Sequence, residues 1–76
     1  MQLTKKQQEV LGYISMFILA KGISPTVREL CCLTGIRSTS TMAGYLDRLQ
    51  RKGYIIKDPN SPRTLRVVKK YEIQTL

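Results

Sequence analysis

The sequence has no histidine and no tryptophan, and its two cysteines, Cys31 and Cys32, are adjacent. Without histidine, the chain lacks the commonest general base and the commonest metal ligand of proteins. Adjacent cysteines do not have the C-x-x-C spacing of a zinc site, and no other residues complete one. We therefore expect no metal, no cofactor and no catalysis. We also predict that at least one of the two cysteines is a small buried residue of a helix.

The sequence also lacks a membrane-spanning run, and we expect no cleavable leader. Its longest nearly apolar stretch covers only residues 13–20, whereas a membrane-spanning helix needs about 20 apolar residues. No small-residue cleavage site follows the basic pair Lys5 and Lys6. The 76 residues have the size of one small domain, and we expect this domain to reside in the cytoplasm.

Acidic residues are scarce and unevenly distributed. Five Asp and Glu stand against thirteen Lys and Arg, which gives a net charge of +8. Between Arg37 and Lys70 the chain has nine basic residues and two acidic ones. Such one-sided charge attracts polyanions, either nucleic acid or an anionic membrane. The asymmetry favours this interpretation over the alternative, in which the charge serves solubility alone.

Three segments have the start and stop signals of helices. In the first, Thr4 and Gln7 form a capping-box pattern and Lys21–Gly22 ends the helix. An apolar stripe with helical spacing lies between these signals: Val10, Leu11, Ile14, Phe17 and Ile18. In the second, Thr26 and Glu29 repeat the capping box, and Thr34–Gly35 ends the helix after about two turns. Its apolar residues are Val27, Leu30, Cys31 and Leu33.

The third helix begins at Ser38 as its N-cap and ends at Lys52–Gly53. Its inward stripe is predicted to contain Met42, Tyr45, Leu46 and Leu49. A β-hairpin is predicted after it, with strands at 54–57 and 64–68 and turn residues at 58–62. We expect residues 69–76 to be a tail or the start of a hinge.

Two short helices joined by a tight turn at Gly35 are typical of a helix-turn-helix, with Ile36 pointing back to the core. A basic hairpin after the second of them indicates a winged helix. We therefore predict a mainly α fold with a small β-hairpin, a three-helix winged helix-turn-helix that binds DNA through residues 1–68.

The residues closely resemble the N-terminal DNA-binding domain of the LexA repressor family, over about residues 3–68. The matching segments are 4–11, 22–30, 35–41, 44–46, 48–49, 52–55 and 58–63. The Ser-Thr-Ser-Thr start of the third helix and the D-P-x-x-P-R turn are most similar to the Gram-positive branch. The resemblance implies a bacterial or phage-encoded, nucleoid-associated repressor of DNA-damage (SOS) genes, whose third helix enters the major groove of a palindromic operator.

The resemblance also implies which residues contact DNA. Base contacts would fall at Ser38, Ser40, Thr41, Ala43 and Gly44. Physics supports the three hydroxyl residues, because a helix N-terminus presents free N–H groups and short side chains to phosphates and base edges. Ser38 also has the simpler role of an N-cap, and Gly44 could instead permit tight packing against the second helix. The candidates for phosphate or wing contacts, each of which could also be an ordinary surface charge, are Arg28, Arg37, Arg48, Arg51, Lys52, Arg63 and Arg66.

We expect the chain to depart from the family by lacking the C-terminal self-cleaving Ser-Lys peptidase and dimerisation domain. It is therefore expected not to be an enzyme, and to be either a DNA-binding domain or a stand-alone small regulator. Double-stranded DNA is the expected partner, with a homodimer formed on DNA or through the missing domain. Two alternatives stay open: a module that modulates a full-length repressor by protein–protein contact, and non-specific RNA binding. The aromatic residues form no evident base-stacking platform for RNA.

Overall fold

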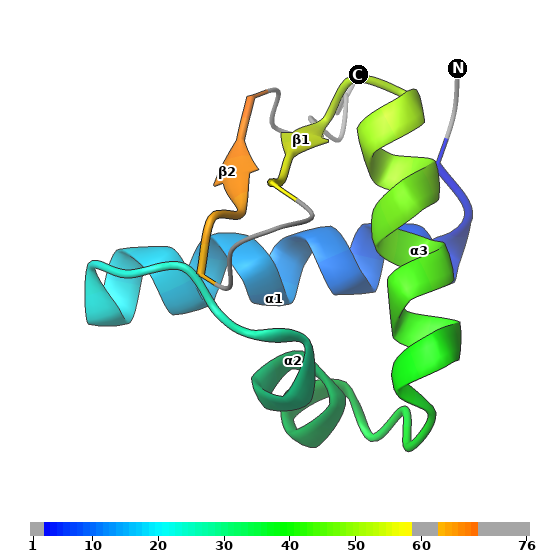
Figure 1. The fold of residues 1–76 in the computed structure, drawn as a ribbon, viewed down its shortest axis with the longest axis horizontal. Coiled ribbons are helices and arrows are strands. Elements are labelled where there is room, and N and C mark those ends of the chain that lie inside the picture. The colour runs from blue at the N-terminus through cyan, green and yellow to red at the C-terminus, as the bar shows by residue number, and fades with distance from the viewer. Residues whose placement is uncertain (1–2, 59–62, 69–76) are drawn as a thin grey trace, which may run out of the picture.

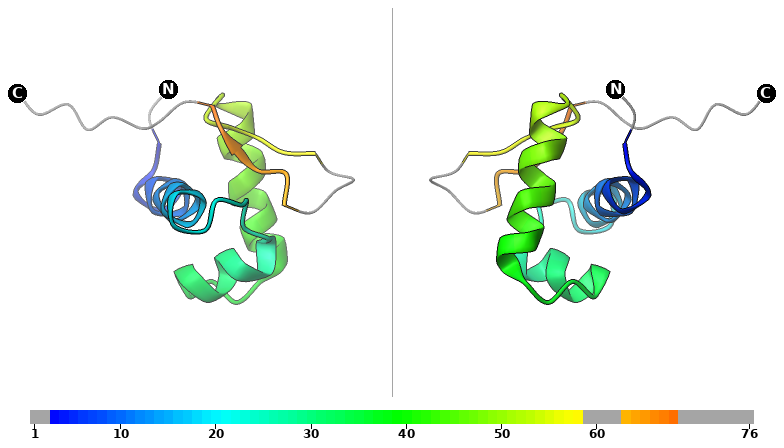
Figure 2. Two further views of the ribbon diagram at one scale, coloured as in Figure 1. Left: turned by 90° about the vertical axis from the view of Figure 1, so that its left-hand side faces the viewer. Right: turned by 90° about the vertical axis from the view of Figure 1, so that its right-hand side faces the viewer.

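The computed structural model describes residues 3–58 and 63–68 of the chain. Its elements follow the order α1 (Lys5–Lys21), α2 (Val27–Thr34), α3 (Thr39–Arg51), β1 (Ile55–Ile56) and β2 (Arg66–Val67). Figure 1 shows α3 crossing α1 steeply, with α2 below α1 and the hairpin on the other side. The two side views in Figure 2 place the hairpin beside the C-terminal half of α3. The predicted mainly helical winged helix-turn-helix is confirmed.

The helices begin and end where the local signals place them. In α1, the Gln7 backbone N–H donates to Thr4 Oγ1 at 3.2 Å, and the Thr4 N–H donates to Gln7 Oε1 at 3.1 Å. Thr26 and Glu29 form the same capping box at α2, with distances of 3.2 and 2.8 Å. Gly35 ends α2 in the left-handed region, with φ 79°. The predicted capping boxes and the glycine turn between α2 and α3 are therefore confirmed.

A single hydrophobic core lies where the three helices and the hairpin meet. α1 contributes Val10, Leu11 and Ile14, while α2 contributes Leu30. Leu3, just before α1, also belongs to the core, and the remaining core residues come from the α3 side and the hairpin: Met42, Leu46, Leu49, Tyr54, Ile55 and Leu65. Ile36 packs partly buried against this cluster, as its place after the turn predicted. The inward stripe of α3 is confirmed for its three aliphatic residues, whereas Tyr45 is only half-buried.

The prediction that at least one cysteine of α2 is buried is wrong, since Cys31 is half-buried and Cys32 is exposed. Leu33, the last apolar residue of α2, is 44% exposed. The reason is geometric. The face of α2 that includes Val27, Leu30 and Cys31 is turned to the core, and a short amphipathic helix buries only one such face. Leu33 and Cys32 lie outside that face.

The hairpin strands are shorter than predicted. β1 and β2 pair antiparallel over two residues each, with Ile55 opposite Val67 and Ile56 opposite Arg66. Beyond this ladder, the Val68 N–H donates to the Tyr54 carbonyl at 2.8 Å. At the other end of the hairpin, the Leu65 N–H donates to a side chain instead, to Ser24 Oγ at 2.9 Å. The predictions for 59–62 and for the tail 69–76 lie outside the described residues. Within the part of the chain that is described, no helix has both the length and the apolar character of a membrane span.

Candidate nucleic-acid interface

The start of α3 presents hydroxyl groups to solvent. Ser38 is the N-cap, and its Oγ accepts a hydrogen bond from the Thr41 N–H at 3.2 Å. Both of these residues are exposed, and so are Thr39 and Ser40 between them. Met42 is completely buried and anchors the first turn in the core. Because of this anchor, the helix holds an uncharged, hydroxyl-bearing end outward in a fixed orientation.

An open hollow of about 280 Å³ lies on α3 next to this end, lined by Thr41, Gly44, Tyr45 and Arg48. A β-carbon on Gly44 would meet no atom within 4 Å outside its own helix backbone. Tight packing against α2 therefore does not explain this glycine. Because glycine has no side chain, the outer surface of α3 is recessed between Thr41 and Arg48. Ala43, beside it, is half-buried.

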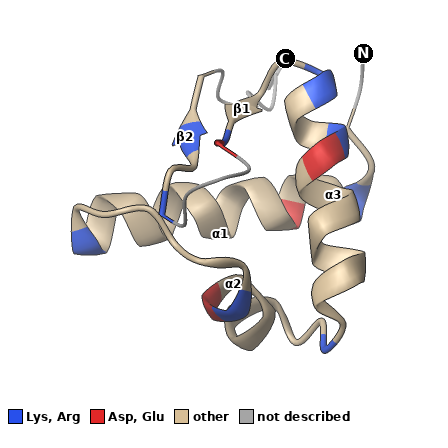
Figure 3. Ribbon diagram, in the orientation of Figure 1, with Lys and Arg blue, Asp and Glu red and all other residues tan. Residues whose placement is uncertain are grey.

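Basic residues are spread over several elements. Figure 3 shows them on α1, on α2, on the turn just before α3, on the C-terminal half of α3 and on the hairpin. Four of the seven candidate phosphate contacts are exposed, and their side chains form no ion pair or hydrogen bond with another described residue: Arg28, Arg37, Arg48 and Arg66. These four can reach an external anion without breaking an internal contact.

The other three candidates are held by contacts inside the protein. Arg51 Nε lies 3.0 Å from Asp47 Oδ2 on the preceding turn of α3. Lys52 donates through Nζ to Oε1 of Gln7 at 2.8 Å, and the Gln7 side chain is only 3% exposed. Lys52 thus links the end of α3 to the start of α1. Using either cation on DNA would require the loss or rearrangement of these contacts.

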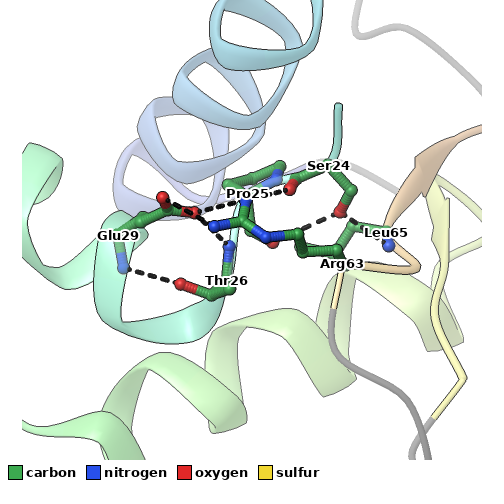
Figure 4. A network of polar contacts seen from close by, with 6 residues as sticks. All are labelled: Ser24, Pro25, Thr26, Glu29, Arg63 and Leu65. Atoms are coloured by element: carbon green, nitrogen blue, oxygen red, sulfur yellow. Dashed lines mark hydrogen bonds and ion pairs between the residues drawn. The ribbon is translucent and has the colours of Figure 1, made fainter. Parts of the chain in front are cut away.

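Arg63, the third candidate phosphate contact that is held inside the protein, joins the hairpin to the start of α2 (Figure 4). Its Nη1 donates to Glu29 Oε1 at 3.0 Å and to the Ser24 carbonyl at 3.1 Å, and its Nη2 donates to Glu29 Oε2 at 3.1 Å. The Leu65 N–H completes the connection by donating to Ser24 Oγ. We call Ser24, Glu29, Arg63 and Leu65 the wing clamp. Arg63 has a φ of 57°, in the left-handed region that non-glycine residues seldom adopt.

Glu29 serves two structural elements at once. The hydrogen bond from the Thr26 backbone N–H and the guanidinium of Arg63 both lower the pKa of its carboxyl group. The carboxylate therefore stays ionised at neutral pH, where it caps α2 and holds Arg63 of the hairpin against α2.

Sequence reasoning missed the roles of Ser24, Glu29 and Tyr45. Glu29 was recognised only as part of a capping box, and Ser24 was assigned no role. No local signal relates either residue to the hairpin, because their partners lie 34 and 41 positions further along the chain. Tyr45 could have been found from helical spacing, since it follows Thr41 by four residues and precedes Arg48 by three.

A separate apolar groove of about 520 Å³ runs between the C-terminal half of α1 and the hairpin. Ile18, Leu19, Ile56 and Val67 are among its lining residues, and no residue of α3 contributes to it. The described residues include no group of three or more Cys, Asp or Glu side chains placed to hold a metal ion. Among the described residues, α3 and its basic surroundings are thus the arrangement suited to a polyanion.

Three helices with a glycine turn between α2 and α3, followed by a short antiparallel hairpin, define a winged helix-turn-helix protein. The family model described as "LexA DNA binding domain" matches residues 1–64, and the chain belongs to this family. The resemblance stated from the sequence is therefore confirmed.

Similar curated proteins bear the name LexA repressor. The chain is 54% identical over 67 residues to that of Caldicellulosiruptor saccharolyticus, which covers 88% of this chain and 33% of the relative. The chain is 52% identical over 62 residues to the LexA repressor of Lactobacillus delbrueckii subsp. bulgaricus, and this match covers 82% of the chain and 30% of the relative. To the LexA repressor of Clostridioides difficile the chain is 42% identical over 73 residues, and this match covers 96% of the chain and 35% of the relative. The chain spans about a third of the length of these relatives.

Proposed function

We propose that the protein is a LexA-like transcriptional repressor that binds a palindromic operator and controls DNA-damage genes. The observation that carries the proposal is the exposed, uncharged start of α3, together with four exposed arginines whose side chains form no ion pair or hydrogen bond with another described residue. A recognition helix needs short polar side chains at base edges and cations at the flanking phosphates. The α3 surface supplies both. The name of the matching family and of the similar proteins supports the same function.

In this proposal α3 enters the major groove with its first two turns. Ser38, Ser40 and Thr41 would donate to or accept from base edges and nearby phosphates, and the helix N-terminus favours negative charge there. Ala43 and Gly44 would allow close approach and contact with a thymine methyl group. Phosphates would be bound by the four arginines without internal partners: Arg28, Arg37, Arg48 and Arg66. We regard Arg51, Lys52 and Arg63 as secondary, since each would first have to give up a partner.

A single copy of residues 1–68, which we take as the DNA-binding unit, presents one α3 helix and can read one half-site. Two copies related by a two-fold axis would match a palindrome. This segment is assigned a binding role and no catalytic step. A repressor acts where the chromosome lies, so we place the protein in the cytoplasm, at the nucleoid.

Selection from a random duplex library, followed by fluorescence anisotropy, tests the proposal. The enriched site should be two-fold symmetric, and the chain should bind it at least about 1,000-fold more tightly than scrambled duplex at physiological salt. An RNA hairpin of equal length should bind no better than scrambled DNA. Equal affinity for all three would contradict the proposal and favour non-specific polyanion binding. A chain that binds none of them would favour the protein–protein alternative.

A further inference from the structure

The hairpin is too small to hold its own position. Its ladder contains two residue pairs, and a two-stranded hairpin alone is at best marginally stable in water. Contacts outside the ladder must therefore determine where the wing lies relative to α3. Among the described residues, the wing clamp supplies polar contacts of this kind between the hairpin and the segment that opens α2 (Figure 4).

We propose that Glu29 is a positioning residue for DNA binding, which holds the wing through Arg63, and that this ion pair persists in the DNA complex. The inference rests on the proposed function. It assigns Arg63 a role different from that of a phosphate contact: the cation orients the wing, and the phosphates are bound by other residues.

The contacts of Arg63 favour a role in holding the wing over a role as a direct phosphate contact. Both terminal nitrogens of the guanidinium are used, in a two-pronged pair with the carboxylate plus a third bond to the Ser24 carbonyl. Such two-pronged pairs are the stronger and geometrically more specific kind. If Arg63 turned to a phosphate, all three bonds would break. The carboxylate of Glu29 would then lie without its cation on α2, beside Arg28, where a phosphate backbone would repel it.

The substitution Glu29→Gln separates the two roles of this side chain. Glutamine keeps an oxygen that can accept from the Thr26 N–H, and α1 already uses Gln7 in the same capping box. The substitution therefore preserves the cap and removes the charge that holds Arg63. Glu9→Gln on α1 is the matched control, because it raises the net charge by the same amount and disturbs only an exposed pair with Lys6.

The clamp and a direct phosphate contact predict opposite changes in operator affinity for Glu29→Gln. If Glu29 positions the wing, operator affinity falls about three- to fivefold, the change expected for a partly exposed ion pair. Glu9→Gln leaves affinity equal or slightly higher. If Arg63 instead binds phosphate, Glu29→Gln tightens binding, because it frees the cation and removes a negative charge. That result, or no change relative to Glu9→Gln, would overturn the proposal.

A double-mutant cycle with Arg63→Gln gives a second readout. The clamp predicts that operator affinity falls by the same factor in each single variant and in the double variant. It also predicts that the slope of log K against log salt is unchanged. A direct contact predicts a slope smaller by about one for Arg63→Gln, and this outcome would also overturn the proposal.

Amide hydrogen exchange without DNA keeps the test independent of the proposed function. The Leu65 amide should exchange faster in Glu29→Gln than in the original chain, while the core amide of Ile14 on α1 keeps its protection. Unchanged exchange at Leu65 would contradict the clamp. If the original chain binds no operator but Leu65 exchange responds as expected, the proposed function fails while the clamp remains a feature of the fold.

Discussion

At the scale of single residues, Gly44 is a helical glycine whose backbone conformation other residues can also adopt. A β-carbon added at this position would meet no neighbouring atom within 4 Å. Glycine inside a helix lowers stability by about 1 kcal/mol relative to alanine. The protein therefore keeps an unfavourable residue on an exposed surface. In the proposed function, the compensation is the hollow between Thr41 and Arg48, which admits the edge of the DNA.

Gly44→Ala should change stability and binding in opposite directions. The melting temperature should rise by several degrees, since about 1 kcal/mol shifts a domain of this size by roughly 4–8 °C. Operator affinity should fall, because the added methyl group fills the hollow. Gly12→Ala on α1 is the control: this glycine is also helical, exposed and unobstructed, so it should stabilise the fold without affecting DNA binding. A Gly44→Ala chain that binds the operator normally would place the interface elsewhere.

Ser40→Ala should weaken operator binding selectively. Ser40 is exposed and is not the N-cap, so the melting temperature should stay within about 1 °C, as for most surface substitutions. The operator should lose about 1–3 kcal/mol of binding free energy, and scrambled duplex almost none. Arg37→Gln provides the contrast, because the loss of a phosphate contact should weaken both duplexes equally. Equal losses on both duplexes for Ser40→Ala would show that this residue reads no base.

At the scale of elements, the turn between α2 and α3 depends on one backbone conformation. Gly35 has a φ of 79°, and a β-branched residue in this region is strained by about 1 kcal/mol or more. Gly35→Val should lower the melting temperature by several degrees and tilt α3, so that operator affinity also falls. Gly22→Val at the end of α1 meets the same strain, with φ 72°, and should lower stability alone. Unchanged melting and affinity in Gly35→Val would remove the turn from the recognition geometry.

The clamp between α2 and the hairpin should weaken in acid. The folded structure lowers the pKa of Glu29 from its ordinary value of 4.5. Its contribution to stability is therefore complete above that value and is lost as the pH falls through the lower pKa of the folded state. Melting temperatures measured between about pH 6 and pH 3 should fall more steeply for Glu9→Gln than for Glu29→Gln. Parallel curves would show that the Glu29 carboxylate contributes nothing specific.

The elements that could be predicted from the sequence are those whose signals are local. The two capping boxes and the N-cap of α3 each lie within four residues, and each was placed correctly. The sequence did not determine whether Leu33 faces the core, because a two-turn helix has few residues with which to define its buried face. The second strand was predicted to start too early because the Leu65 N–H bonds to a side chain 41 positions away. The clamp, which has the same long-range origin, had no local signature.

At the scale of the whole molecule, charge should govern affinity for any duplex. If each copy neutralises roughly four to six phosphates, log K should fall against log salt with a slope of about −4 to −5. The four arginines without internal partners correspond to the lower end of this range. An anisotropy titration across salt concentrations measures the slope. A slope near zero would contradict DNA binding through this basic surface.

The wing clamp also has a consequence for the order in which the molecule folds. Its bonds close loops of 34 and 41 positions, whereas helix hydrogen bonds form between near neighbours. Closing a longer loop costs more chain entropy, so distant contacts form after local ones. During synthesis, Arg63 and Leu65 also leave the ribosome after the residues of all three helices. The individual helices are therefore expected to form before the wing docks, whereas the packing of α1 against α3, whose Gln7–Lys52 bond spans 45 positions, closes loops as long as those of the clamp.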